Sequence, residues 1–126
     1  MKSHKNLDVW NKAIDFSETI YMITKEYPRE EIYGLVSQMR RAVVSISANI
    51  SEGAARKSTK EFIQFLYIAR GSASELDTLL EISSRTNMAK NDRLTNAKKE
   101  NLILMKMLSA LINSLNTNHK SQVTNH

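Results

Sequence analysis

The 126-residue chain contains no cysteine, one proline and three glycines. The lack of cysteine excludes disulfide bridges, cysteine-ligated zinc and thiolate catalysis. So few proline and glycine residues favour long helices over a fold built from β-hairpins. The apolar runs are far too short to form a transmembrane span, so we expect no membrane contact. The chain starts with a polar segment instead of an apolar signal sequence, and we therefore expect a cytoplasmic protein.

Apolar residues recur at helical spacing in four segments, which cover roughly residues 7–26, 29–55, 58–87 and 92–116. Ser58 and Glu61 form a capping box that predicts the start of the third helix. The unbroken three- and four-residue steps of the fourth segment are typical of coiled-coil packing. Short connections place successive helices side by side and antiparallel. We therefore predict an all-α fold, an antiparallel up-down-up-down four-helix bundle over residues 1–116, with a polar, frayed tail over residues 117–126.

The residues that carry acid, base or metal chemistry are nearly absent from the predicted helices. The histidines are His4, His119 and His126, and all of them lie near the ends of the chain. A di-metal carboxylate site needs histidines inside the bundle, and a Ser-His-Asp triad needs one on a rigid element. No glycine-rich phosphate loop is present. The sequence therefore predicts a non-enzymatic protein with no metal and no cofactor.

Polar and small residues occupy the middle of the second and third segments, where a core is expected. The polar ones are Arg41, Ser45, Asn49, Glu52, Ser72 and Glu75. An antiparallel turn centred near Lys57 brings Arg41 opposite Ser72 and within one helical turn of Glu75, and Gly71 would let the two backbones approach closely. Because a buried charge must be paired, we predict an Arg41–Glu75 ion pair within a buried polar network. The alternative is that these charges face solvent.

The net charge of +5 favours acidic partners, with nucleic acid first. The antiparallel order brings the start of the chain, the turn between the second and third segments and the end of the fourth to one end of the bundle. The candidates for phosphate contact there are Lys2, Lys5, Arg56, Lys57 and Lys60. Such residues bind a phosphate backbone without reading sequence, but a solvated charged end explains them equally well.

Several short motifs resemble those of one protein family in order and spacing. They are Asp8-Val9-Trp10, Tyr27-Pro28, Gln38-Met39-Arg40-Arg41-Ala42, Ser45-Ile46-Ser47-Ala48-Asn49-Ile50-Ser51-Glu52-Gly53, Phe65-Leu66-Tyr67-Ile68-Ala69, Gly71-Ser72 and Glu75-Leu76. With these motifs the chain resembles the four-helix-bundle proteins encoded in intervening sequences of bacterial 23S rRNA genes. That family often has a further glycine where this chain has Ala54-Ala55.

The resemblance implies a four-helix bundle that forms a ring-shaped homo-oligomer, often a pentamer. It also implies a kinship with bundles that bind nucleic acid and reverse transcriptase in diversity-generating retroelements, and it supplies no catalytic residue. Apolar positions beyond one bundle face give mild support to an oligomer, although a thick core explains them too; they include Val9, Phe16, Ile23, Ile103, Met107 and Ile112. We expect an oligomeric protein that binds RNA or another nucleic acid through a basic surface. The alternative is a protein–protein adaptor whose charge is incidental.

Overall fold

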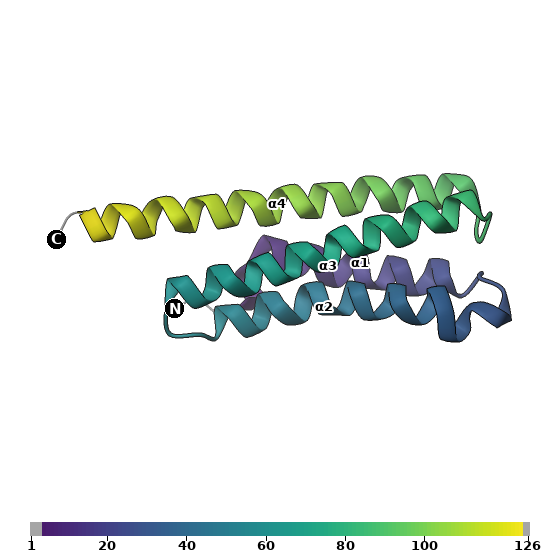
Figure 1. The fold of residues 1–126 in the computed structure, drawn as a ribbon, viewed down its shortest axis with the longest axis horizontal. Coiled ribbons are helices and arrows are strands. Elements are labelled where there is room, and N and C mark those ends of the chain that lie inside the picture. The colour runs from purple at the N-terminus through teal and green to yellow at the C-terminus, as the bar shows by residue number, and fades with distance from the viewer. Residues whose placement is uncertain (1–3, 125–126) are drawn as a thin grey trace.

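The computed structural model describes residues 4–124, except for the side chains of Asn6 and residues 119–124. Within that range the chain forms four long helices and no strand. Their bounds are α1 Asp8–Thr24, α2 Ser37–Ala54, α3 Thr59–Arg85 and α4 Asn91–Thr124. Each of α1 and α3 packs against both α2 and α4, and successive helices run in opposite directions (Figure 1). The predicted antiparallel up-down-up-down bundle is confirmed.

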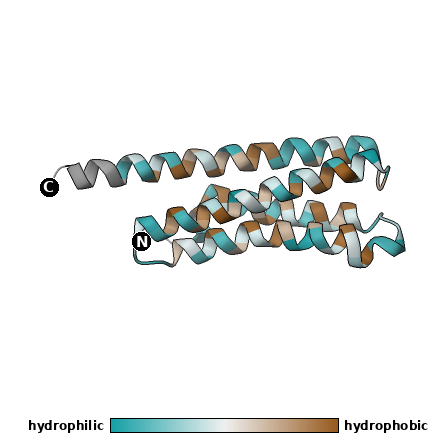
Figure 2. Ribbon diagram, viewed as in Figure 1, coloured by the Kyte–Doolittle hydropathy of each residue, from teal (hydrophilic) through white to brown (hydrophobic). Residues whose placement is uncertain are grey.

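The hydrophobic core lies where the apolar stripes of the four helices face one another (Figure 2). Its largest side chains, each less than 2% exposed, are Phe16, Ile20, Ile23, Met39, Ile46, Ile50, Leu66, Leu76, Leu80, Leu94, Leu104 and Leu108. Burial of one such side chain stabilises the fold by about 1.5–3 kcal/mol. The sequence has apolar positions beyond those that one bundle face requires, and most of them belong to this core. Val9, Phe16, Ile23 and Ile112 are buried. Of that group, Ile103 is exposed.

The sequence predicts that the second helix begins near residue 29, but residues 29–36 do not form regular α-helix. A 3₁₀ turn, Arg29–Glu31, and a π-helical turn, Ile32–Val36, precede α2. Gly34 has φ −110° and ψ −112°, outside the helical range, so the backbone turns there and the apolar stripe is interrupted. Ile32 was expected in the stripe but is 46% exposed, and Tyr33 beside it is 96% exposed.

Both ends of α3 are capped by local hydrogen bonds. At its start the Ser58 hydroxyl accepts a hydrogen bond from the Glu61 backbone amide at 3.2 Å, which confirms the predicted N-cap. At its end Asn87 adopts a left-handed conformation with φ 57°, and the Met88 amide donates to the Ser83 carbonyl at 3.0 Å. This pattern is a Schellman motif, which stops α3 and reverses the chain toward α4.

α2 and α3 approach each other closely at Gly53. A Cβ atom added at this position would lie 2.7 Å from Phe65 Cβ and 2.9 Å from Phe62 Cδ1. At Gly71, by contrast, an added Cβ would meet no atom within 4 Å. The expectation that Gly71 allows a close approach was therefore wrong, and Gly53 is the glycine that does so.

α4 continues past Asn116 to Thr124 and extends beyond the ends of the other three helices (Figure 1). The predicted frayed tail is therefore wrong for residues 117–124, and the rest of that tail lies outside the described residues. The physical reason is that residues 91–124 include no proline or glycine that would break the helix. No helix in the described range is both long and apolar enough to cross a bilayer.

Candidate nucleic-acid interface

The lysines predicted to contact phosphate lie at the end of the bundle that holds the α2–α3 turn. Lys57 and Lys60 are exposed on that turn and on the first residues of α3, and Lys5 is exposed ahead of α1. Lys2 lies outside the described residues. Lys57 in the α2–α3 turn and Lys60 in the first turn of α3 therefore lie at the same end of the bundle.

Arg56 at the same end is already engaged by its own neighbours. Its guanidinium forms an ion pair with Glu52 at 2.5 Å and lies over the Phe65 ring, 4.8 Å from the ring centroid. The pairing cancels its charge locally, so Arg56 is a weaker phosphate ligand than its position suggests.

The polar residues in the middle of α2 and α3 form a small neutral network. The Ser72 hydroxyl donates to the Ser45 hydroxyl across the helix interface at 2.9 Å. The Asn49 amide donates to the Ser45 carbonyl at 2.8 Å and to its hydroxyl at 2.9 Å. These three side chains are half-buried, and their hydrogen bonds satisfy one another without a charged group.

The predicted Arg41–Glu75 ion pair does not form. Both residues belong to the described part of the chain, both are exposed, and no ion pair joins them. Because the serine contact already satisfies the interface, the charges remain at its rim, where water solvates them. Glu52, the remaining member of the predicted network, is exposed and pairs with Arg56.

Arg41 and Glu75 instead line an open cavity of about 1270 Å³, which we name the α2 cavity. It is bordered by the end of α1, the α1–α2 connection, α2 and the middle of α3. The described residues that line it include three tyrosines, four basic side chains and a single carboxylate: Tyr21, Tyr27, Tyr33, Lys25, Arg29, Arg40, Arg41 and Glu75. Aromatic rings and cations therefore share one concave surface.

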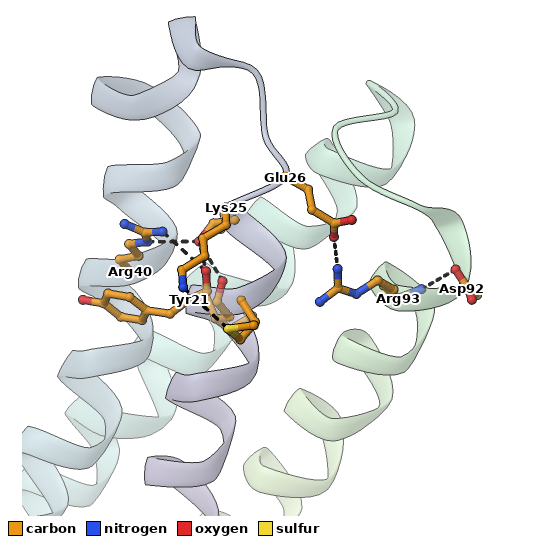
Figure 3. A network of polar contacts seen from close by, with 9 residues as sticks. Tyr21, Lys25, Glu26, Arg40, Asp92 and Arg93 are labelled. Carbon is orange, nitrogen blue, oxygen red and sulfur yellow. Dashed lines mark hydrogen bonds and ion pairs between the residues drawn. The ribbon is translucent and has the colours of Figure 1, made fainter.

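The four basic side chains of the α2 cavity are not neutralised by acids. Across the described residues, the ion pairs are Arg56–Glu52, Arg85–Glu81, Arg93–Glu26 and Lys98–Glu81, and none of them involves a cavity residue. Figure 3 shows Arg93 reaching Glu26 on the opposite side of α1 from Arg40. The charge of the cavity is thus available to an anionic ligand.

Arg40 is held in place between α1 and α2 (Figure 3). Its guanidinium lies 4.5 Å from the centroid of the Tyr21 ring, and its Nε donates to Thr24 Oγ1 at 3.0 Å. A second nitrogen donates to the Tyr21 carbonyl at 3.4 Å. All of these partners are neutral, so Arg40 is fixed in orientation while it keeps its full charge.

Tyr27 closes the inner wall of the α2 cavity. Its side chain is 7% exposed, and its hydroxyl makes no hydrogen bond. Burial raises the pKa of Tyr27 above its ordinary value near 10.0, an effect that the nearby Ser83 hydroxyl partly opposes. The Ser83 proton is directed to the Leu79 carbonyl at 2.8 Å, which leaves Ser83 as a weak partner at most.

A second hollow, between α1 and α4, has the opposite character. It measures about 470 Å³, and its lining includes one arginine and three carboxylates beside polar and apolar side chains: Arg93, Asp15, Glu18, Glu100, Thr19, Asn96, Met22 and Ile23. Its excess of carboxylates repels phosphate. The two sides of α1 therefore differ in the sign of their charge, and of these two hollows the α2 cavity suits an anionic partner.

Sequence reasoning placed its candidates for phosphate contact at the α2–α3 end and missed three of the four cavity cations, Lys25, Arg29 and Arg40. A count of the charged residues at each end of the bundle does not show which basic side chains form ion pairs with acids. The available signal was the Arg40-Arg41 dipeptide on a helix whose start is close to three tyrosines.

The described residues offer no metal-binding cluster. No group of three or more histidine, aspartate or glutamate side chains in that range is placed to hold a metal ion. His4 makes an edge contact with the Trp10 ring, with 4.9 Å between centroids. The side chains of His119 and His126 lie outside the described residues.

The fold and this site together define a helical-bundle protein with a basic, tyrosine-lined cavity. Over residues 5–110 the chain matches the family of 23S rRNA-intervening sequence proteins, and it belongs to that family. Among solved structures it is similar to a protein of unknown function from the S23 ribosomal protein family of Bacteroides thetaiotaomicron. The two are 28% identical with a TM-score of 0.77, over 82% of this chain and 97% of that one. No curated protein matches the chain significantly.

Proposed function

We propose that this protein is a non-enzymatic scaffold that binds RNA or another nucleic acid through the α2 cavity. The observation that carries the proposal is the gathering of Lys25, Arg29, Arg40 and Arg41 in one cavity without an ion pair to any of them. Lys57, Lys60 and Lys5 add a second, weaker basic surface at the other end of the bundle. The family's description links its members to 23S rRNA genes, which supports a nucleic-acid partner.

Contacts between the basic side chains of the α2 cavity and phosphates would position a nucleic-acid backbone without reading the base sequence. Each phosphate neutralised by a cation releases a counterion, so the affinity should fall steeply as salt rises. A binding constant that is insensitive to salt would therefore contradict the proposal.

The test is a fluorescence-anisotropy titration of a structured RNA over a range of salt concentrations. Two double variants each remove two positive charges from exposed residues: Arg29→Ala with Arg41→Ala in the α2 cavity, and Lys57→Ala with Lys60→Ala at the other end. We expect the cavity variant to lose roughly tenfold or more in affinity and to flatten the salt dependence. The lysine variant should lose less. Absence of RNA binding by the unaltered protein at low salt, or equal losses in both variants, would overturn the assignment of the site.

We also propose that the protein assembles with itself. Support comes from large apolar side chains that α3 and α4 leave exposed, namely Tyr67, Ile68, Ile82, Leu102 and Ile103. A pentamer is the assembly that the family resemblance implies, and it would have five times the 14.4-kDa mass of the chain. Light scattering at micromolar concentration tests this point, because a monomeric mass would contradict self-association.

The alternative function is a protein–protein adaptor. The specific observation in its favour is that three arginines outside the cavity, Arg56, Arg85 and Arg93, are paired with acids and are unsuited to phosphate. An adaptor would use the exposed apolar side chains for a protein partner and would show no salt-dependent RNA binding. The titration above therefore separates the two functions.

A further inference from the structure

Tyr33 is the most exposed large hydrophobic side chain among the described residues, and the backbone conformation places it in solvent. The π-helical turn Ile32–Val36 and the non-helical Gly34 carry Tyr33 away from the core, and it is 96% exposed. It nevertheless lines the α2 cavity together with Arg29 and Arg41. A tyrosine placed in water beside cations contributes little to the fold, which points to a role in binding.

The ring of Tyr33 is free on both faces, unlike the rings of the other tyrosines. Arg40 covers Tyr21 at 4.5 Å from its centroid, and Arg70 covers Tyr67 at 4.8 Å. Tyr27 is buried. No ring contact or hydrogen bond engages the side chain of Tyr33, which is described in full. It therefore offers a flat aromatic surface to a ligand.

We propose that the α2 cavity binds a single-stranded nucleic-acid segment, with an unpaired base stacked on Tyr33 and flanking phosphates held by Arg29 and Arg41. This inference rests on the proposed function and narrows its ligand. A positively charged groove with an aromatic platform is the physical basis of single-strand binding, and stacking tolerates every base because each has a π face. A duplex keeps its base faces inside the helical stack, where Tyr33 cannot reach them.

The test compares four labelled ligands by anisotropy: a short single-stranded RNA, the same sequence as a duplex, and the DNA counterpart of each. We expect both single strands to bind more tightly than their duplexes. Tyr33→Ala should weaken single-strand binding roughly tenfold or more, whereas Tyr33→Phe should retain it because the ring remains. Tyr33→Leu keeps an apolar side chain of similar size without an aromatic face, so it is the matched control and should bind as weakly as Tyr33→Ala.

Salt dependence distinguishes stacking from charge. Tyr33→Ala should lower the affinity without changing its salt slope, since no phosphate contact is lost, whereas Arg29→Ala with Arg41→Ala should flatten the slope. Because Tyr33 is 96% exposed, its removal should leave the thermal unfolding curve unchanged, which shows that the fold is intact.

The two proposals fail in different ways. If duplex and single strand bind equally well, or if Tyr33→Ala binds like the parent while the arginine variant is impaired, the single-strand inference is overturned and the nucleic-acid function stands. If the parent binds none of the four ligands at low salt, the proposed function itself is wrong.

Discussion

Each end of the bundle places an arginine over an aromatic ring, and the two arginines serve different purposes. Near the α2–α3 turn, Arg56 lies 4.8 Å from the Phe65 centroid and pairs with Glu52. Near the α1–α2 connection, Arg40 lies 4.5 Å from the Tyr21 centroid and bonds only to neutral oxygen atoms. The two ends therefore differ in whether a carboxylate neutralises the stacked arginine, and of these two arginines Arg40 is the one whose charge remains unpaired for an anionic ligand.

The two ends also differ in how tightly their backbones pack. At the α2–α3 turn, Gly53 admits the side chains of Phe62 and Phe65 into direct contact with the α2 backbone. At the α1–α2 connection, a 3₁₀ turn and a π-helical turn replace regular helix, and the α2 cavity opens beside them. Side-chain volume that is added where the packing is tight produces strain, whereas an open surface has room for it.

The largest expected effect is on packing at Gly53. Gly53→Ala adds a Cβ that would lie 2.7 Å from Phe65 Cβ, an atom that cannot move without its backbone. We expect a loss of about 2 kcal/mol in the free energy of unfolding, because overpacking outweighs the helix propensity of alanine. Urea unfolding measures the loss.

Gly71→Ala is the matched control on the other helix of the same pair. An added Cβ there meets no atom within 4 Å, so the variant should gain about 0.5–1 kcal/mol from helix propensity alone. Equal changes in the two variants would show that α2 and α3 are not in close contact at Gly53.

The sequence predicts the bundle well because helical periodicity is a local property. Each buried stripe could be identified from spacing alone, and the N-cap at Ser58 follows from a hydroxyl and an amide a few residues apart. The kink at Gly34 was missed because the spacing of the apolar residues does not show that the backbone of this glycine is non-helical. The extension of α4 was missed because polar composition was taken as a sign of fraying.

The site was harder to predict because it depends on which charges meet. Arg41 and Glu75 were placed at the correct interface, but whether they face the core or the rim is decided by about half a helical turn of rotation. The Ser45–Ser72 contact took the inner position, at 2.9 Å between the hydroxyls. The pairing of Glu26 with Arg93 on α4, which leaves the cavity without that acid, depends on a long-range contact that the spacing of residues does not show.

Arg40 and Arg56, which lie over the Tyr21 and Phe65 rings, should differ in how much they contribute to the free energy of unfolding. Arg40→Met removes the cation over Tyr21 and the hydrogen bond to the buried Thr24 hydroxyl, which joins α1 to α2. We expect a loss of about 1 kcal/mol in unfolding free energy. Arg56→Met removes an exposed ion pair between the α2–α3 turn and Glu52 near the end of α2, together with the cation over the Phe65 ring. It also removes a buried Nε that has no hydrogen-bond partner. Its loss should be no more than about 0.5 kcal/mol.

Thermal and urea unfolding of the two methionine variants, measured side by side, test the contrast between the ends. A larger loss for Arg56→Met would mean that the ion pair with Glu52 is a structural element of the turn. In that case the contacts of Arg40 with Tyr21 and Thr24 would stabilise the fold less than those of Arg56, contrary to the prediction.

The smallest expected effect appears only at alkaline pH and concerns Tyr27 at the α1–α2 end. Burial raises the pKa of its phenol in the folded state, so the unfolded chain gives up that proton at a lower pH. Stability from this group is therefore complete below the ordinary tyrosine pKa of about 10 and is lost as pH rises through the folded-state value. Tyr27→Phe removes the ionisable group and should unfold less readily than the parent at about pH 11, while the two should be nearly equal in stability at about pH 8.

Lysines also lose their charge in this range, so Tyr33→Phe is the control. The side chain of Tyr33 is 96% exposed, and the stability of the variant should follow that of the parent at both pH values. If Tyr27→Phe follows the parent as well, the phenol is reached by water through the α2 cavity, and the inner wall of the cavity is more open than the structure shows.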